Sequence, residues 1–488
     1  MKNKILIGII ASSMAFGACK TELLDLAPVT SFSDLTVFDN QSRVDQQIRG
    51  LYNTVRDGNF LGGRYYVYHE IRGENFINET SNNVTGLSVW NFTVQPSNVN
   101  DVNNLWNTCY LAINRINVFL EGIDANADKL RAQGVTDATL NGYRAEARFL
   151  RAVTYFSLQQ LYGNPYADGN GSKLGVLLRL TANVSAGPND LARSTTAQVY
   201  DQILEDLNFA ETNLPLTRSS ASENTTRAHR NSAIAFKTRV YTSMGRNGDV
   251  ITEANKIVST SAPFSAGSGV ANALTETYAA AFSAPYTTSD NIFSMPFTEN
   301  TLPGTQNGLG HYFNPGPTGG GEYSMNPAGI IANTAWETDD DRRKMISTAA
   351  NGKIYWAKFP RGPQHLDYAP VIRYAEVMLN LAEALARTNG VDARALELLN
   401  AVRTRANATA YEAGQFASGN DLVEAILLER QIEFLGEGHR GVDLQRLQRE
   451  LPAKANVSSV GPSSPAYLWP LPQAELLANK AAVQNPGY

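Results

Sequence analysis

Residues 145–165, AEARFLRAVTYFSLQQLYGNP, form the stretch that decides the fold, because they predict a helix together with its stop signal. Ala145, Phe149, Ala152 and Phe156 follow the three-and-four spacing that places side chains on one helix face. Gly163 and Pro165 end the pattern, as glycine and proline commonly do after the last helical turn. An apolar face of this length has to be buried against a partner helix.

Helices of the same kind precede and follow this one. One face pattern runs through Trp106, Cys109, Tyr110, Ile113, Ile116 and Leu120. A capping box at Thr195-x-x-Gln198 starts another helix that ends at Pro215, and an Ala-rich stretch follows. The carboxy-terminal third repeats the theme at 372–389, 392–408 and 421–435, the last starting from Asp421-x-x-Glu424. These patterns predict a mainly α protein whose helix pairs stack into a solenoid-like core.

Residues 58–104 and 260–370 break the helical pattern. Both are rich in Gly, Asn, Ser, Thr and Pro, yet they carry many aromatic residues, which disordered segments lack. Aromatic faces among Asn, Asp and Arg side chains suit a sugar, whose rings have an apolar face and a rim of hydroxyls. We predict that these are loop-rich ligand-binding segments. The alternative is that the rings only pack the loops onto the helices.

Charge and cysteine content exclude several classes of protein. The 488 residues carry a net charge of -5 with a pI near 5.7, which argues against nucleic acid as a partner. The only cysteines are Cys19 and Cys109. If Cys19 is lipidated, no intrachain disulfide and no cysteine-ligated metal site can form.

Motifs for chemistry are missing. The sequence has no His-Glu-x-x-His, no Gly-x-Ser-x-Gly and no Gly-Lys-Ser/Thr loop, and its five histidines are scattered. Glu429 and Glu433 share a helix face and could pair a general acid with a base. An ion-pair network with the nearby Arg430, Arg440 and Asp443, joining the last two helices, explains them more simply. The run 339–344, DDDRRK, is expected to form a solvated turn or helix start. We predict no catalytic residue, no metal and no cofactor.

The first 18 residues resemble an export signal, with Lys2 and Lys4, a short apolar run, and small residues before Cys19. Gly-Ala-Cys is similar to a bacterial lipobox, so we predict a signal peptide over 1–18 and a lipidated Cys19. Residues 19–40 are then the lipid anchor and a polar tether. An ordinary signal peptide beside a chance cysteine is the alternative.

A family resemblance extends over nearly the whole chain. Its motifs are ACxxxxLD at 18–25, AINRIN at 112–117, AEARFLRAxxYFxLxxLYGNxP at 145–165, VYDQILEDLNFAExxLP at 199–215, RYAEVMLNLAEALAR at 373–387, LNAVRTRA at 399–406, ERQIEFLGEGHRGVDLQR at 429–446, LWPLPQAEL at 468–476 and QNPGY at 484–488. Together they resemble the SusD/RagB family of Bacteroidetes surface lipoproteins.

The resemblance implies a tetratricopeptide-like scaffold over 41–57, 105–258 and 371–450 within a SusD-like domain at 41–488. It also implies an oligosaccharide-binding lipoprotein on the extracellular side of the outer membrane, acting as the lid of a SusC-like TonB-dependent transporter. A peptide cargo, as in the RagB branch, and a surface glycoside hydrolase are the alternatives.

Position in the loop-rich segments gives candidate ligand contacts. Stacking platforms are expected at Tyr65, Tyr66, Trp90, Tyr312 and Trp336, with hydrogen bonds from Arg72 and Asn75. The segment 65–76, YYVYHEIRGENF, resembles a family segment in which Asp commonly stands at the position of Glu74.

Overall fold

The computed structural model describes residues 37–184 and 189–488 of the chain. The predicted signal peptide, Cys19 and most of the tether therefore lie outside the described residues. The amino-terminal helices are α2 (Gln41–Val55), α3 (Arg64–Glu70), α4 (Leu87–Trp90), α5 (Asn104–Ala125), α6 (Ala127–Ala132), α7 (Asp137–Tyr162), α8 (Thr196–Asn213), α9 (Ala221–Thr226), α10 (Arg230–Met244) and α11 (Asn247–Ala254).

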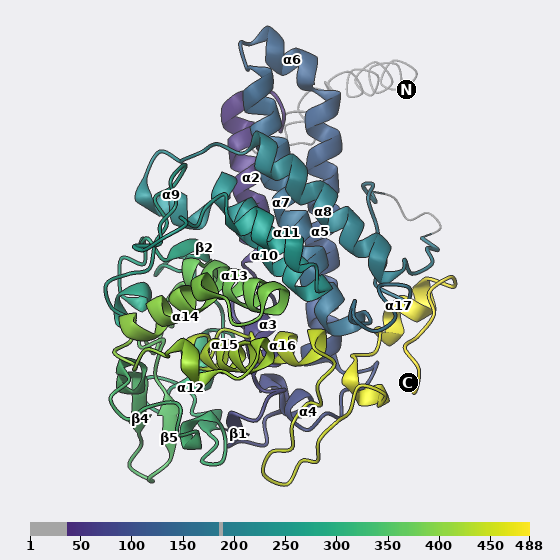
Figure 1. Ribbon diagram of the computed structural model, residues 1–488. Helices are drawn as coiled ribbons and strands as arrows, with labels where there is room; N and C mark the ends of the chain where they lie inside the picture. The colour runs from purple at the N-terminus through teal and green to yellow at the C-terminus, as the bar shows by residue number, and fades with distance from the viewer. Residues whose placement is uncertain (1–36, 185–188) are drawn as a thin grey trace, which may run out of the picture.

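Helices return after a long irregular segment. They are α12 (Leu309–Phe313), α13 (Tyr374–Asn389), α14 (Ala393–Arg405), α15 (Gly419–Glu433), α16 (Arg440–Arg446) and α17 (Gln473–Ala478). In Figure 1 the helices α13 to α16 lie below α7, α8, α10 and α11, so the two helical halves stack on each other. The mainly α, tetratricopeptide-like fold predicted from the periodicity and the resemblance is confirmed.

Consecutive helices pack as pairs. The long helix α7 packs between α5 and α8, α10 packs on α8 and α11, and α13 contacts α11, α14 and α15. The faces that meet are apolar: Phe149 and Phe156 of α7 make edge-on contacts with Phe236 of α10 at centroid distances of 6.1 and 5.3 Å. In these contacts the edge of one phenyl ring packs against the face of the other, and they join the helix pairs into one core.

Helix ends follow the capping chemistry of the sequence, with one correction. Thr195 and Gln198 form the predicted capping box at the start of α8. The helix α15 begins earlier than predicted, because Ser418 and not Asp421 is its N-cap, and the side chains of these two residues cap each other's backbone N–H.

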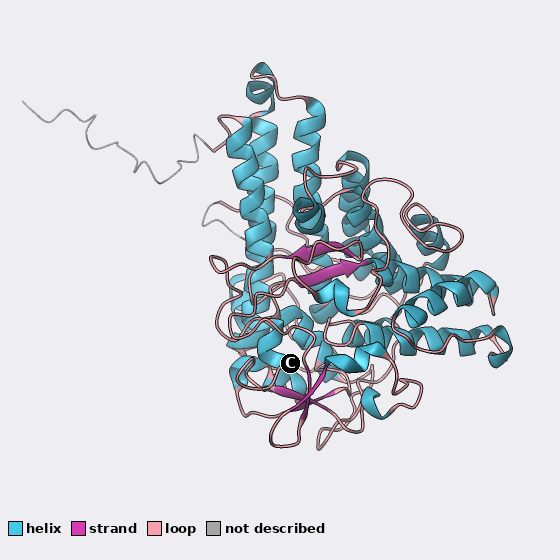
Figure 2. Ribbon diagram, turned by 90° about the vertical axis from the view of Figure 1, so that its left-hand side faces the viewer, coloured by secondary structure: helices cyan, strands magenta, loops and turns pink. Residues whose placement is uncertain are grey.

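Strands connect the irregular segments to each other and to the helices. Three antiparallel pairs occur in the described part of the chain: β1 (Phe76–Asn78) with β3 (Tyr323–Met325), β2 (Asn291–Met295) with β6 (Ala369–Arg373), and β4 (Ile346–Thr348) with β5 (Ile354–Trp356). The β1–β3 pair matches Phe76 with Met325 and so joins the two loop-rich segments. Figure 2 shows the strands lying among loops rather than forming a layer of their own.

Candidate functional site

The seven ligand contacts predicted from the sequence are all buried, with 6% exposure or less. Tyr65 and Tyr66 lie together on α3 with ring centroids 5.8 Å apart. The Trp90 indole donates to the carbonyl of Phe76 at 3.0 Å, and the Tyr312 hydroxyl donates to the carbonyl of Gln306 at 2.7 Å. In both cases the polar atom of the ring is used by a backbone carbonyl of the same loop-rich segment.

The other three predicted ligand contacts, Trp336, Arg72 and Asn75, are also held by other groups of the protein. Trp336 packs edge-on against Trp356 at 5.9 Å, beneath the guanidinium of Arg343. Arg72 donates to the backbone carbonyl of Tyr467 at 2.5 Å, and the side-chain amide oxygen of Asn75 accepts the backbone N–H of Ile330 at 3.2 Å.

All five rings are buried in this conformation, as the packing alternative predicts, and no ring face is open to a sugar. Their role as ligand contacts stays a prediction.

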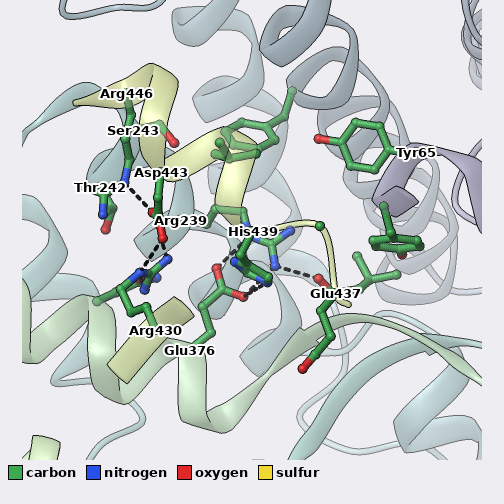
Figure 3. A pocket seen from close by; sticks show the side chains of 16 residues that line it. Tyr65, Arg239, Thr242, Ser243, Glu376, Arg430, Glu437, His439, Asp443 and Arg446 are labelled. Carbon is green, nitrogen blue, oxygen red and sulfur yellow. Dashed lines mark hydrogen bonds and ion pairs between the residues drawn. The ribbon is translucent and has the colours of Figure 1, made fainter. Parts of the chain in front are cut away.

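Tyr65 and Tyr66 instead line a small interior cavity between α3, α10, α13 and α16, shown in Figure 3. Arg239 is paired with Glu376 at 2.5 Å, and burial lowers the pKa of the neighbouring His439 to about 4, which keeps that imidazole neutral. The cavity volume is about 20 Å³, and one water needs roughly 10–15 Å³ on the same measure. It therefore has no room for a sugar.

Glu429 and Glu433 belong to a buried ion-pair network, as the structural alternative predicted, but their partners are not the expected ones. Arg430 pairs with Asp443, and Arg440 pairs with Glu74. Glu429 pairs with Arg342 at 2.5 Å and with Arg403 at 2.9 Å. Glu433 pairs with Arg405 at 2.6 Å, Arg373 at 2.9 Å and Arg342 at 3.3 Å. Burial alone would raise the pKa of Glu433, but these guanidinium groups lower it. Both carboxylates are thus fully engaged in structure.

The run 339–344 corrects an expectation. Its turn forms, as a short 3-10 helix at Asp341–Met345, but Arg342 has 0% exposure and Asp340 has 2%. Arg342 lies at the centre of the ion-pair network, so Asp340 and Arg342 belong to the core. Asp339 and Lys344 are exposed, as expected for a solvated turn or helix start.

Residues 436–441, GEGHRG, match the glycine spacing of a dinucleotide-binding loop, but their position gives a packing role. They follow helix α15 instead of a strand. Gly438 has a φ of +76°, and a side chain there would come within 2.6 Å of the Tyr66 backbone. A side chain at Gly441 would come equally close to the carbonyl of His69. These glycines let the loop pack against α3.

An open groove of ligand size lies elsewhere, between α5, residues 178–183 and 189–191, and α17. Its volume is about 620 Å³, within the roughly 300–1,000 Å³ of small-molecule sites. Leu111 of α5 and Leu180 line it and are 47% and 40% exposed, so part of its wall is apolar. The groove thus combines open access with an unprotected hydrophobic surface.

Asparagine side chains fix the walls of the groove. Asn114 uses both amide atoms to hold the backbone of Asn183, donating to its carbonyl at 3.0 Å and accepting its N–H at 2.7 Å. Asn479 holds Leu191 in the same way, with both bonds at 2.9 Å. An amide group has two donor hydrogens and two lone pairs, so Asn114 keeps one of each for a ligand. Asn479 is saturated, because it also donates to Glu475 at 3.0 Å and accepts the N–H of Ala481 at 3.2 Å.

Charged groups complete the lining. Arg179 donates to the carbonyl of Asn189 at 3.1 Å and pairs with Glu475 at 3.2 Å. One carboxylate oxygen of Asp190 accepts the backbone N–H of Lys480 at 2.6 Å. The lining therefore contains both hydrogen-bond donors and acceptors besides its apolar residues.

Sequence reasoning missed this groove. Residues 105–258 were assigned to the helical scaffold, and the contribution of α17 comes from about 300 residues further along the chain. The only sequence signal is the recurrence of asparagine at Asn114, Asn183 and Asn189, which periodicity analysis does not weigh.

Taken together, the fold and the groove define a helical-repeat scaffold with long irregular insertions and a surface site of ligand size. The family model described as "SusD family" matches residues 238–488, and the model described as "Starch-binding associating with outer membrane" matches residues 22–242. The chain belongs to the SusD family.

Individual relatives agree over nearly the full length. A SusD superfamily protein from Bacteroides fragilis has a crystal structure with a TM-score of 0.81 and 30% identity, covering 91% of this chain and 99% of its own. SusD-like protein P2 of Formosa agariphila is 23% identical, with 95% of this chain and 96% of the relative covered. A structure titled "Laminarin binding SusD-like protein" has a TM-score of 0.71 at 22% identity, covering 92% and 100%.

Among the helices of the described ranges, none has both the length and the apolar character needed to cross a membrane. The description of the amino-terminal family model refers to association with the outer membrane.

Proposed function

We propose that the protein captures an oligosaccharide at the cell surface and delivers it to a SusC-like TonB-dependent transporter, for which it acts as a lid. The observation that carries the proposal is the open groove of about 620 Å³ lined by Leu111, Leu180 and a set of amide side chains. Membership of the SusD family supports the same role.

The lining of the groove matches the chemistry of a sugar. A sugar ring has a C–H face that packs on aliphatic surface and hydroxyls that both donate and accept hydrogen bonds. Leu111 and Leu180 supply the aliphatic surface. Asn114 and Asp190 supply donors and acceptors that are already held in place by the bonds described above. Such preorganisation lowers the entropic cost of binding.

Binding without turnover fits the state of the candidate carboxylates. A glycoside hydrolase uses two carboxyl groups about 5 to 9.5 Å apart across the scissile bond. Glu429 and Glu433 are held by arginines inside the protein and do not line the groove. Of the two carboxylates that line the groove, Glu475 is paired with Arg179, so Asp190 has no second free carboxylate beside it among the described lining residues. The proposal therefore leaves hydrolysis to other proteins.

Membrane attachment in this proposal comes from lipidation of Cys19, with residues 19–40 as the tether. The described chain starts beside Phe38, which packs on Phe119 of α5, so the tether is fixed to the helical scaffold at that point. Two or more acyl chains give stable anchoring to the outer membrane.

Calorimetric titration tests the proposal. The soluble protein starting after Cys19 is titrated with maltooligosaccharides, laminarioligosaccharides, other plant, host and microbial glycans, and a peptide digest, and each mixture is checked for breakdown. We expect binding of one glycan class without hydrolysis. Peptide-only binding would replace oligosaccharide with peptide as the cargo, and glycan breakdown would make the protein an enzyme.

Two variants of α5 locate the site. Leu111→Glu places a hydrated carboxylate on the apolar wall of the groove. We expect it to weaken binding about tenfold, which corresponds to roughly 1.4 kcal/mol of lost apolar contact. Val118→Glu is the matched control, because Val118 is also an exposed aliphatic residue of α5 but does not line the groove.

Delivery is tested in cells. A variant that binds glycan but has lost its transporter-facing surface is expected to abolish uptake. Normal growth of that strain on the cognate glycan would contradict the lid role.

A further inference from the structure

We infer that the groove selects uncharged oligosaccharides and discriminates against acidic ones such as oligouronates. This inference rests on the proposed function and adds the charge class of its ligand. It follows from the state of each ionisable group that lines or flanks the groove.

The one cation in the lining is already neutralised. The Arg179 guanidinium is paired with Glu475 at 3.2 Å and also donates to the carbonyl of Asn189 at 3.1 Å. Glu475 is further held by the Trp106 indole at 3.3 Å, which fixes the pair against α5. A ligand carboxylate would therefore compete with a built ion pair instead of meeting a free arginine.

Asp190 leaves the lining with an excess negative charge. Within residues 37–184 and 189–488 it forms no ion pair, and its only bond is the backbone N–H of Lys480 at 2.6 Å. Asp190 is exposed and lines the groove, and its second oxygen remains an acceptor, which suits a hydroxyl and repels a carboxylate.

The flanking groups do not reverse this balance. The Lys480 ammonium donates to the carbonyl of Leu477 at 2.7 Å and forms no ion pair with Asp190 within the described ranges. Glu121 lies at the other rim, where it accepts the N–H of Ala182 at 2.7 Å. The two flanking charges are opposite in sign, so the lining groups decide the potential in the groove.

Coulomb's law gives the size of the effect. Two like charges about 6 Å apart repel by roughly 0.7 kcal/mol in bulk water and by about 2.8 kcal/mol at the effective dielectric of a protein surface. This range corresponds to about 3-fold to 100-fold in affinity, so a discrimination of about tenfold is expected at low salt. Screening reduces it above about 0.1 M salt.

The test compares probes of equal length. Maltoheptaose and laminariheptaose are the neutral probes and heptagalacturonate is the acidic probe, each titrated calorimetrically at low and at high salt. Asp190→Asn keeps an oxygen for the Lys480 N–H while removing the charge. Asp128→Asn is the control, because Asp128 is a fully exposed carboxylate on α6 that does not line the groove.

We expect at least one neutral probe to bind about tenfold more tightly than heptagalacturonate at low salt. High salt and Asp190→Asn should both reduce this difference in affinity, whereas Asp128→Asn should leave it unchanged. Equal or tighter binding of heptagalacturonate to the unmodified protein would overturn the inference and leave glycan capture standing. Failure of every glycan in the wider panel to bind would overturn the proposed function and this inference together.

Discussion

Replacing Glu433 by glutamine tests whether the buried carboxylates are structural. Glu433 has 0% exposure and contacts Arg405 at 2.6 Å, Arg373 at 2.9 Å and Arg342 at 3.3 Å. Glutamine has the same shape but no charge, so the three guanidinium groups lose a shared counter-ion.

The loss falls unevenly on the three arginines. Arg342 keeps Asp340 and Glu429, and Arg373 keeps Asp290 and Glu437. Arg405 keeps only Asp290, at 3.5 Å. Breaking a buried pair by removing one partner costs about 3–5 kcal/mol, since a buried charge is left without compensation.

The melting temperature is the readout. At roughly 2.1 cal/mol/K per residue for the entropy of unfolding, a chain of this size converts that loss into a decrease of about 3–5 °C. Glu424→Gln is the control on the same helix, because Glu424 is 58% exposed and pairs with an exposed Arg449. Such a surface pair contributes about 0–1 kcal/mol. Equal melting temperatures for the two variants would refute the structural assignment.

Three further predictions concern pH, packing and anchoring. Burial raises the pKa of Glu70 to about 7 from an ordinary value of 4.5, so folding stability from this group is lost as the pH rises from about 4.5 to 7. Glu70→Gln removes that dependence. In urea titrations, the free energy of unfolding of the variant relative to the unmodified protein is expected to rise by about 3 kcal/mol between pH 4 and pH 8. A free-energy difference that stays constant over this pH range would contradict the raised pKa of Glu70. Trp336→Ala is expected to lower the free energy of unfolding by about 3–5 kcal/mol, because Trp336 is 1% exposed and packs on Trp356; a stability loss below 1 kcal/mol would mean that the ring is not part of the core. Cys19→Ser is expected to move the protein from the membrane fraction to the soluble fraction, and retention of the variant in the membrane would count against lipidation.

The helical scaffold could be predicted from the sequence because its signals are local. The face pattern of residues 145–165 and the stop at Gly163 gave α7 its end at Tyr162. The predicted start of α15 at Asp421 was wrong, because Ser418 is the N-cap: its side-chain oxygen accepts the backbone N–H of Asp421.

The burial of the seven candidate ligand contacts could not be predicted in this way, because burial in a loop depends on distant partners. Trp90 and Tyr312 have the composition of a sugar site, but their polar atoms are used by carbonyl groups of the loops. Arg342 looked solvated in a charged run, yet its partners Glu429 and Glu433 come from a helix almost 90 residues away. The groove could not be predicted for the same reason, because Arg179 and Glu475, which pair in its lining, are 296 residues apart in the sequence.

The crystal structure of the protein with its tightest-binding oligosaccharide tests the central claim most directly. The account predicts that the sugar lies in the groove between α5 and α17, with its rings against Leu111 and Leu180 and its hydroxyls bonded to the Asn114 and Asp190 side chains. A sugar bound instead over residues 58–104 or 260–370, with the groove empty, would contradict it.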